Sequence, residues 1–391
     1  MQKDKKVERS IANLVVIQPT PFCNLDCTYC YLPNRDLKEV IKTETVDNIA
    51  RVVFSTPNIS EHVTIVWHAG EPLTVPRDFY RVAHNIIDKR KPDNVKLTYN
   101  FQTNGTLIDD SWCEFFKNDN VKVNVSIDGP EFIHDKNRVN KAGKGTFKQV
   151  MNGIGYLQKH NIDFGVLTVL TETSVHYPNE IFDFFSKNKI HRIGFNVEEI
   201  EGVNTVSSFK NKESDKQVLK FFETLLRLTD KDESIHIREL DNMVRRIENG
   251  SNIMRSDSEP LRIVSFDYKG NVSTFSPELL SNKHYLYGDF AFGNVHNIQN
   301  LTDILSNPKF IRVNEDILIG KEACKERCQY YIVCGSGSPS NKIYENNTFK
   351  STETMVCRLQ EQVVAEAVLS HLEKRHVKVT ELVTIKTQST V

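Results

Sequence analysis

The sequence lacks the features that would take a protein into a membrane or onto a nucleic acid. It has no run of about 18 apolar residues, the length that a helix needs to cross a bilayer. Its charged start, MQKDKKVERS, has no apolar segment of the kind found in signal peptides. The formal net charge of −1 gives no field to attract nucleic acid. We therefore expect a cytoplasmic protein that binds neither membranes nor nucleic acids.

Internal repeats and low-complexity segments are also missing. The 391 residues exceed one ordinary domain, so two joined units are expected. The predicted division is a tail over 1–12, a first domain over 13–200, a helical bridge over 201–260, a second domain with a C-terminal helix over 261–375, and a tail over 376–391.

Cysteine is scarce, and its distribution is uneven. The chain has eight cysteines, of which seven fall in two groups. This grouping favours metal binding in a reducing cytoplasm over a set of disulfides. The remaining one, Cys113, lies on a predicted amphipathic helix, where a small buried thiol is the simplest interpretation.

The first group is Cys23, Cys27 and Cys30, in the stretch TPFCNLDCTYCY. Three thiolates can hold three corners of a [4Fe–4S] cube and leave the fourth iron open to a substrate or cofactor. The alternative is a zinc knuckle, but structural zinc takes four protein ligands, and the loop offers no fourth cysteine or histidine. The spacing therefore favours an iron–sulfur cluster.

Short β-rich runs alternate with helical stretches over the first half of the chain. Predicted strands are Leu14–Ile17, Val63–Trp67, Leu97–Phe101, Lys122–Ile127, Phe164–Val169 and Arg192–Asn196, and predicted helices are Thr45–Phe54, Arg77–Asp88, Asp109–Phe116, Phe147–Gln158 and Pro178–Asn188. This alternation predicts an α/β fold with a parallel sheet and right-handed crossovers. In such sheets, ligands bind at the carboxyl ends of the strands.

The Cys-x3-Cys-x2-Cys pattern, with Tyr29 before the third cysteine, resembles the signature of the radical S-adenosylmethionine (SAM) enzymes. The resemblance implies a partial (β/α)6 barrel of the TIM type, because six alternations are too few for a closed eight-fold barrel. It also implies that the open iron binds the amino and carboxylate groups of SAM. One electron, supplied by a reductant such as flavodoxin or ferredoxin, would then cleave SAM to a 5′-deoxyadenosyl radical.

The same resemblance implies which residues hold SAM. The stretch WHAGEP, residues 67–72, is similar to the family's Gly-Gly-Glu-Pro motif for the methionine amine, with Ala69 in place of the first glycine. Ser126 and Arg138 resemble the segment that binds the carboxylate. The adenine would lie at the ends of the fifth and sixth strands. The implied SAM contacts are Tyr29, Gly70, Glu71, Ser126, Arg138, Val166 and Phe195, whereas Trp67, His68 and His134 are more simply packing residues.

The second cysteine group resembles the SPASM domain, a C-terminal extension of radical SAM enzymes that modify peptides. The full SPASM pattern has seven cysteines around two auxiliary clusters. Here a predicted hairpin, Ile263–Thr274, ends in the stretch 273–278 without a cysteine, and the run 335–339 after Cys334 has a serine where a further cysteine is usual. The resemblance therefore implies one auxiliary [4Fe–4S] cluster and the loss of the one nearer the barrel. The implied ligands are Cys324, Cys328, Cys334 and Cys357.

Within that group, the sequence most resembles the maturases that form cyclophanes in ribosomally made precursor peptides. These enzymes join an aromatic ring carbon to the β-carbon of a nearby residue. The implied reaction removes a β-hydrogen, forms the carbon–carbon bond, and passes one electron to the auxiliary cluster. Glu278 or Asp267 could accept the proton, and an acidic run, Glu198–Glu201, lies near the predicted barrel mouth.

Three alternatives stay open. An anaerobic sulfatase maturase, which forms formylglycine, would keep all seven SPASM cysteines. A thioether-forming enzyme would need a precursor cysteine. A scaffold that binds zinc or a cluster without catalysis would dock peptides and leave SAM intact.

Overall fold

A computed structural model describes residues 10–209, 213–249 and 256–374. The predicted tail over 376–391, and all but three residues of the predicted tail over 1–12, lie outside these ranges. None of the described helices is both long and apolar enough to cross a membrane.

One sheet of ten strands forms the centre of the molecule, in the order β12-β9-β8-β1-β2-β3-β4-β5-β6-β7. In this order, every neighbouring pair from β8-β1 to β6-β7 is parallel. The pairs β8-β9 and β9-β12 are antiparallel. The bounds are β1 Leu14–Ile17, β2 His62–Trp67, β3 Lys96–Thr103, β4 Lys122–Ser126, β5 Phe164–Leu170, β6 Arg192–Val197, β7 His236–Ile237, β8 Ile263–Phe266, β9 Asn271–Thr274 and β12 Gly293–Asn294, with β10 Lys283–His284 and β11 Gly288–Asp289 paired separately.

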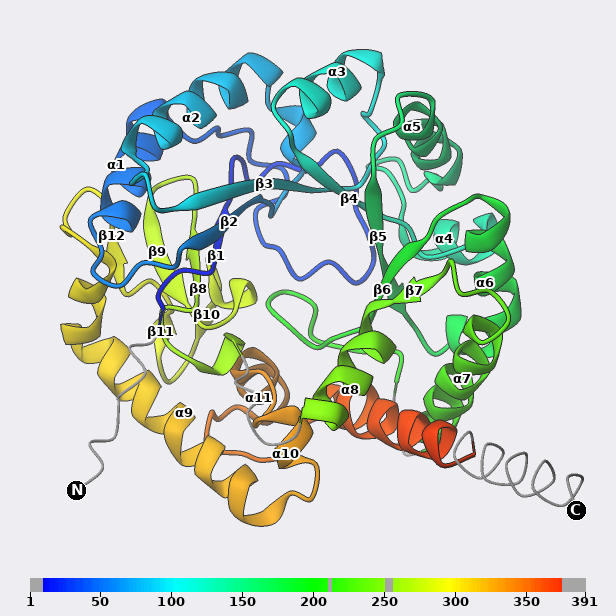
Figure 1. Cartoon of the computed structure of the whole chain (residues 1–391). Helices are drawn as coiled ribbons and strands as arrows, with labels where there is room; N and C mark the ends of the chain where they lie inside the picture. Colours follow the sequence, from blue (N-terminus) through cyan, green and yellow to red (C-terminus); the bar gives the residue numbers. More distant parts are fainter. Residues whose placement is uncertain (1–9, 210–212, 250–255, 375–391) are drawn as a thin grey trace, which may run out of the picture.

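Helices surround the curved parallel strands on the outside (Figure 1). They are α1 Thr43–Phe54, α2 Arg77–Arg90, α3 Asp110–Asn118, α4 Glu131–Asn137, α5 Phe147–Lys159, α6 Pro178–Lys187, α7 Glu213–Thr229, α8 Arg238–Asn249, α9 Pro308–Arg327, α10 Tyr331–Cys334 and α11 Pro339–Asn346. Each predicted strand and helix of the first half is present within two residues at each end. The predicted partial barrel is therefore confirmed.

Alternation along the strands separates an apolar outside from a polar inside. On β3, Tyr99 and Phe101 are buried in the core, whereas Asn100 and Gln102 are half-buried on the opposite face. Asn100 accepts a hydrogen bond from Asn124 Nδ2 on β4 at 3.1 Å. The outward residues pack against aromatic side chains of α2 and α3, where Cys113 is fully buried as expected. The barrel interior is thus polar and open to ligands at its mouth.

The C-terminal half is built onto the barrel through the same sheet. β8 pairs in parallel with β1, so that Val16 lies opposite Ser265. A helical segment over 355–374, drawn in orange and red, lies beside α7 and α8 (Figure 1). Arg246 Nη1 on α8 lies 2.7 Å from Glu361 Oε2 in this segment. The second predicted unit is therefore fixed against the first by both strand pairing and helix packing.

Candidate active site

The loop that carries the first three cysteines follows β1 and is held from the side by residues 137–140. The amide of Asp26 donates to the carbonyl of Val139 at 2.7 Å, and the amide of Thr28 donates to the carbonyl of Asn137 at 3.0 Å. These bonds place the loop across the carboxyl ends of the parallel strands, where α/β folds bind ligands.

Cys23, Cys27 and Cys30 line one pocket of about 240 Å³. Burial raises the pKa of the Cys23 thiol to about 12 and that of the Cys27 thiol to about 11, so metal loading has to displace protons. Five of the seven predicted SAM contacts line the same pocket: Tyr29, Gly70, Glu71, Ser126 and Arg138.

The other two predicted SAM contacts, Val166 and Phe195, do not line this pocket. Val166 is buried in the hydrophobic core, and Phe195 packs against Phe221 of α7 at a ring-centroid distance of 5.4 Å. Successive residues of a strand point to opposite faces, so the prediction was displaced by one residue. The neighbours Leu167 and Asn196 line the pocket instead.

Glycine is required at position 70. A Cβ atom there would lie 2.2 Å from the carbonyl oxygen of Thr20 and 2.7 Å from that of Phe22, and the φ angle is +76°. Ala69, which stands where the family has its first glycine, also has a left-handed φ of +66°. The turn after β2 is therefore packed directly against the cysteine loop.

Glu71 holds this turn in place with a buried carboxylate that accepts three hydrogen bonds. Its donors are the amides of Leu73 and Asn104, at 2.9 and 2.7 Å, and the hydroxyl of Thr103 at 2.7 Å. A carboxylate has about four acceptor positions, which leaves room for one more donor. Burial raises the pKa of this carboxyl to about 7. A ligand ammonium, such as the methionine amine of SAM, would suit the site because it brings the opposite charge.

Asp128 is a site residue that the sequence did not single out. Its carboxylate is 1% exposed, accepts from Arg138 Nε at 3.0 Å, and also accepts from the hydroxyl of Tyr29. The amide of Val169 donates to the same carboxylate at 3.0 Å. Its place in an Asp-Gly-Pro turn at the end of a predicted strand is the feature of the sequence that could have indicated it. Asp128 therefore orients two predicted SAM contacts, Tyr29 and Arg138.

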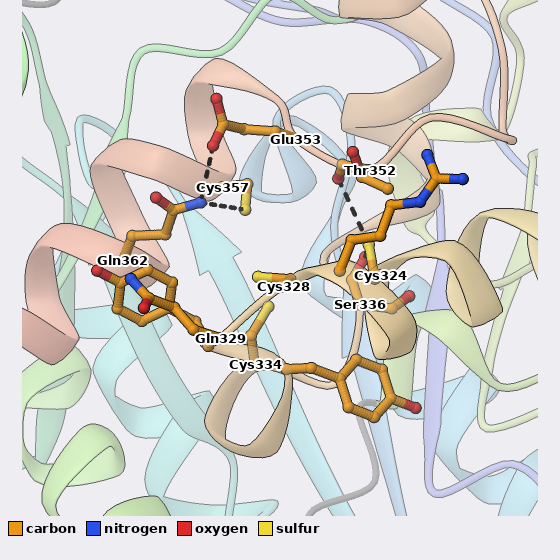
Figure 2. Close-up of a pocket in the computed structure, with 12 residues that line it drawn as sticks. Cys324, Cys328, Gln329, Cys334, Ser336, Thr352, Glu353, Cys357 and Gln362 are labelled. Carbon is orange, nitrogen blue, oxygen red and sulfur yellow. Dashed lines mark hydrogen bonds between the residues drawn. The ribbon is translucent and has the colours of Figure 1, made fainter.

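The second group of cysteines surrounds a separate cavity of about 330 Å³ (Figure 2). Cys324 lies in the last turn of α9, Cys328 at its end, Cys334 at the end of α10, and Cys357 at the start of the π-helical segment Cys357–Gln362. Gln362 Nε2 lies 3.6 Å from the sulfur of Cys357. Donors around the sulfurs are typical of thiolate ligands in iron–sulfur sites.

Four thiols that line one cavity are the ligand set of a [4Fe–4S] cube. Zinc requires four ligands around one centre, whereas a [4Fe–4S] cube takes one thiolate at each of four corners. The four thiols around a cavity would therefore hold an auxiliary cluster.

Comparison with known proteins agrees with this geometry. Residues 17–185 match the model of the Radical SAM superfamily. An uncharacterized protein of Synechocystis is 42% identical over 93% of this chain and 92% of its own length. The serine-type anaerobic sulfatase-maturating enzyme of Bacteroides thetaiotaomicron is 29% identical over 84% of this chain and 83% of its own length.

This chain belongs to the radical SAM superfamily. It is a radical SAM enzyme, and its cofactors are a [4Fe–4S] cluster and SAM. Solved structures that share its fold include two with a bound peptide. The enzyme anSMEcpe with bound AdoMet and Cp18Cys peptide has a TM-score of 0.76 and 21% identity, covering 94% of this chain and 99% of its own. Streptococcus suis SuiB bound to the precursor peptide SuiA has a TM-score of 0.61 and 16% identity, covering 89% and 76%.

Three carboxylates also line the pocket that holds Cys23, Cys27 and Cys30, which we call the SAM pocket. We call Glu199, Glu201 and Glu278 the acidic group. Ser340 Oγ donates to Glu201 at 2.7 Å, and Asn341 Nδ2 donates to Glu199 at 2.8 Å. Burial raises the pKa of Glu199 to about 7 and also raises the pKa values of the other two. Burial therefore favours the protonated form of each carboxyl in the acidic group.

The structure separates the two candidate proton acceptors. Asp267 accepts hydrogen bonds from the amides of Lys269 and Asn271 at 2.9 Å each, which closes the turn between β8 and β9. It does not line the SAM pocket, whereas Glu278 does. Asp267 is thus a turn residue, and Glu278 remains as the candidate.

The residues interpreted as packing residues fall into two kinds. Trp67 is fully buried and donates to His84 at 3.0 Å, and His134 is fully buried with its Nε2 3.1 Å from the hydroxyl of Thr146. His68 instead lines the SAM pocket, and burial lowers its pKa to about 4. His68 is therefore a neutral pocket residue that the packing interpretation missed.

One helix reaches both pockets. Residues 340 and 341, at the start of α11, donate hydrogen bonds to the acidic group. The next residue, Lys342, has its Nζ 3.5 Å from the sulfur of Cys324. This link could not be predicted from the sequence, because it depends on how α11 is placed between the two halves.

We expect the two cysteine groups to load independently. The wild-type enzyme should carry roughly eight irons after anaerobic reconstitution, since seven thiolates divide as three and four. Replacing Cys23, Cys27 and Cys30 by alanine should leave roughly four irons and abolish SAM cleavage. Iron analysis and assay of 5′-deoxyadenosine measure both.

The matched control for this experiment is C113A, which removes a buried thiol outside both pockets and should keep roughly eight irons. Normal 5′-deoxyadenosine production by the triple variant would contradict the assignment of the first site. Zinc bound at the C-terminal cysteines would contradict the assignment of the second.

Removing the charge of Asp128 should weaken SAM binding. D128N keeps an oxygen acceptor but loses the charged partner of Arg138, and a hydrogen bond to a charged group contributes about 1.5–3 kcal/mol. We therefore expect at least a tenfold rise in Kd for SAM, measured anaerobically on the reconstituted protein.

The control is D26N, which breaks the pair between Asp26 and Arg35, where the Asp26 side chain is 50% exposed. Such surface pairs contribute about 0–1 kcal/mol, so its Kd should change by less than about fivefold. An equal effect of both variants would show that Asp128 does not orient the SAM contacts.

Proposed function

We propose that this radical SAM enzyme forms a cyclophane in a ribosomally made peptide, by joining an aromatic ring carbon to the β-carbon of a nearby residue. The observation that carries the proposal is the set of residues around Glu278, which lines the SAM pocket. Where the resemblance to the full SPASM pattern expects cysteines for a nearer cluster, this chain has a hydrogen-bonded serine and carboxylate network. Ser276 Oγ contacts Glu278 and lies 3.1 Å from Ser340 Oγ.

That network favours one class of chemistry over another. Among the described residues, Cys23, Cys27 and Cys30 are the cysteines that line this pocket, so it would offer a substrate thiol no second cluster to bind directly. A reaction that needs such binding, as thioether formation can, is therefore disfavoured. A carbon–carbon crosslink needs only a hydrogen-atom acceptor, a proton acceptor and an electron acceptor at a distance. The peptides named in the two structural neighbours support a peptide substrate.

The residues of the pocket supply the remaining requirements. Bound in their two pockets, the clusters and SAM would supply the radical that removes a substrate hydrogen atom and a centre that can accept an electron. Forming the new carbon–carbon bond breaks one C–H bond at the β-carbon and one C–H bond of the aromatic ring. One hydrogen leaves as an atom, and the other leaves as a proton and an electron. The acidic group lies at the pocket to receive that proton, with Glu278 as the first candidate.

Formylglycine formation is the second candidate. The similarity to a serine-type sulfatase-maturating enzyme over most of the chain favours it. This reaction would oxidise a serine or cysteine side chain to an aldehyde and would not join two residues. The products of the two reactions are therefore chemically distinct.

The product distinguishes the two reactions. The enzyme co-expressed with short peptides encoded beside its gene should give a product that is two hydrogens lighter per crosslink. Tandem mass spectra should show no fragmentation between the joined residues, and prior alkylation of precursor cysteines should change nothing. Co-expression with the triple cysteine variant is the control and should leave the peptide mass unaltered.

Two results would contradict the cyclophane proposal. An aldehyde detected by hydrazine labelling would indicate formylglycine formation. A lighter product that forms only when the precursor has a free cysteine would indicate a thioether.

Proton acceptance by the acidic group should make crosslinking pH-dependent. Burial raises the pKa of Glu199 to about 7 and also raises the pKa of Glu278, and a carboxyl must lose its own proton before it can accept another. Crosslinks formed per SAM cleaved should therefore increase as the pH rises through about 7. E278Q should lower this ratio by about 100-fold or more, the usual contribution of a general base, while 5′-deoxyadenosine still forms.

The matched control is E131Q, because Glu131 lies on α4 with a 54% exposed side chain away from the SAM pocket. Its ratio of crosslinks to SAM cleaved should equal that of the wild type. A ratio that is independent of pH and unchanged in E278Q would exclude the acidic group as the proton acceptor.

A further inference from the structure

Lys342 is a buried lysine without a carboxylate partner. Lys342 lies on α11 and is 4% exposed. Its ammonium donates to the carbonyl of Gly320 at 3.3 Å and lies 3.5 Å from the sulfur of Cys324. No Asp or Glu forms an ion pair with it within the part of the chain that the structure describes. A buried ammonium is costly unless an anion compensates it.

The compensating anion available to Lys342 is the thiolate of Cys324. A cube held by four thiolates is an anion in both of its oxidation states, and reduction adds one more negative charge. A fixed cation beside a ligand sulfur therefore stabilises the reduced state more than the oxidised state. Net charge and hydrogen bonds to the sulfurs are among the factors that set cluster potentials.

We propose that Lys342 is a positioning residue that raises the reduction potential of the auxiliary cluster in the four-cysteine pocket. This inference rests on the proposed function only in that a higher potential suits a centre that accepts an electron from the substrate. The four cysteines alone do not determine the reduction potential of this cluster, and the charge of Lys342 is a further contribution to it.

The placement of Lys342 is specific to this pocket. Lys325, one residue after Cys324, pairs instead with Glu322 at 3.2 Å and has a 57% exposed side chain. Solvent screens an exposed charge, so Lys325 should contribute little to the potential. The two lysines therefore differ in burial and in partner while both lie near the same ligand.

The experiment is an anaerobic redox titration of the full-length reconstituted enzyme, followed by electron paramagnetic resonance. Added SAM changes the signal of the cluster with the open iron and so identifies the other cluster. K342M should lower the potential of the auxiliary cluster by about 59 mV or more, a tenfold change in its one-electron equilibrium constant. The iron content and the potential of the SAM-binding cluster should stay at wild-type values.

Three further variants separate charge from other effects. K342R keeps the charge and should stay close to the wild-type potential. K342Q keeps a hydrogen-bond donor without charge and should shift with K342M, which also serves if K342M fails to retain iron. K325M is the matched control and should not shift.

An unchanged potential in both K342M and K342Q would overturn the inference, as would an equal shift in K325M. A shift in K342M alone would overturn it too, since a hydrogen bond and not a charge would then be responsible. These titrations contain no peptide, so their failure leaves the crosslinking proposal standing. If the mass-spectrometric experiment finds no crosslink, the expected change in the reduction potential of the Lys342 variants still stands.

Discussion

The close contact between the cysteine loop and the turn after β2 is the constraint on which the rest of the site depends. Gly70 permits this contact because a side chain there would collide with the carbonyl of Thr20. The amide of Glu71 donates to the carbonyl of Phe22 at 2.7 Å, while the Glu71 carboxylate binds the segment after β3. Three strand ends are thereby joined at one point. The remaining pocket residues acquire their positions relative to the cysteines from this junction.

A second junction joins the pocket to the C-terminal half. Ser340 and Asn341 at the start of α11 donate to the acidic group, and the next residue, Lys342, reaches Cys324. Proton acceptance and electron acceptance are separate requirements of the proposed reaction, and residues 340–342 contact the groups assigned to each.

Much of this arrangement could be predicted from the sequence, because the decisive signals are local. Apolar runs predicted β1 to β6 within two residues at each end, and spacing alone grouped the seven cysteines. Val166 and Phe195 were misplaced because the face that a strand residue occupies depends on register, which pattern does not fix. Asp128, the pairing of β8 with β1, and Lys342 were missed because burial and long-range packing give them their roles.

The most direct test of the account follows hydrogen from the substrate. A precursor peptide would carry deuterium on the β-carbon of one residue and on the ring of its aromatic neighbour. The account predicts that one β-deuterium appears in 5′-deoxyadenosine and that the crosslinked product has lost one ring deuterium to solvent. Mass spectrometry of both products measures the two transfers at once. A product that retains every ring deuterium would contradict the formation of a bond at the ring, and with it the proposed function.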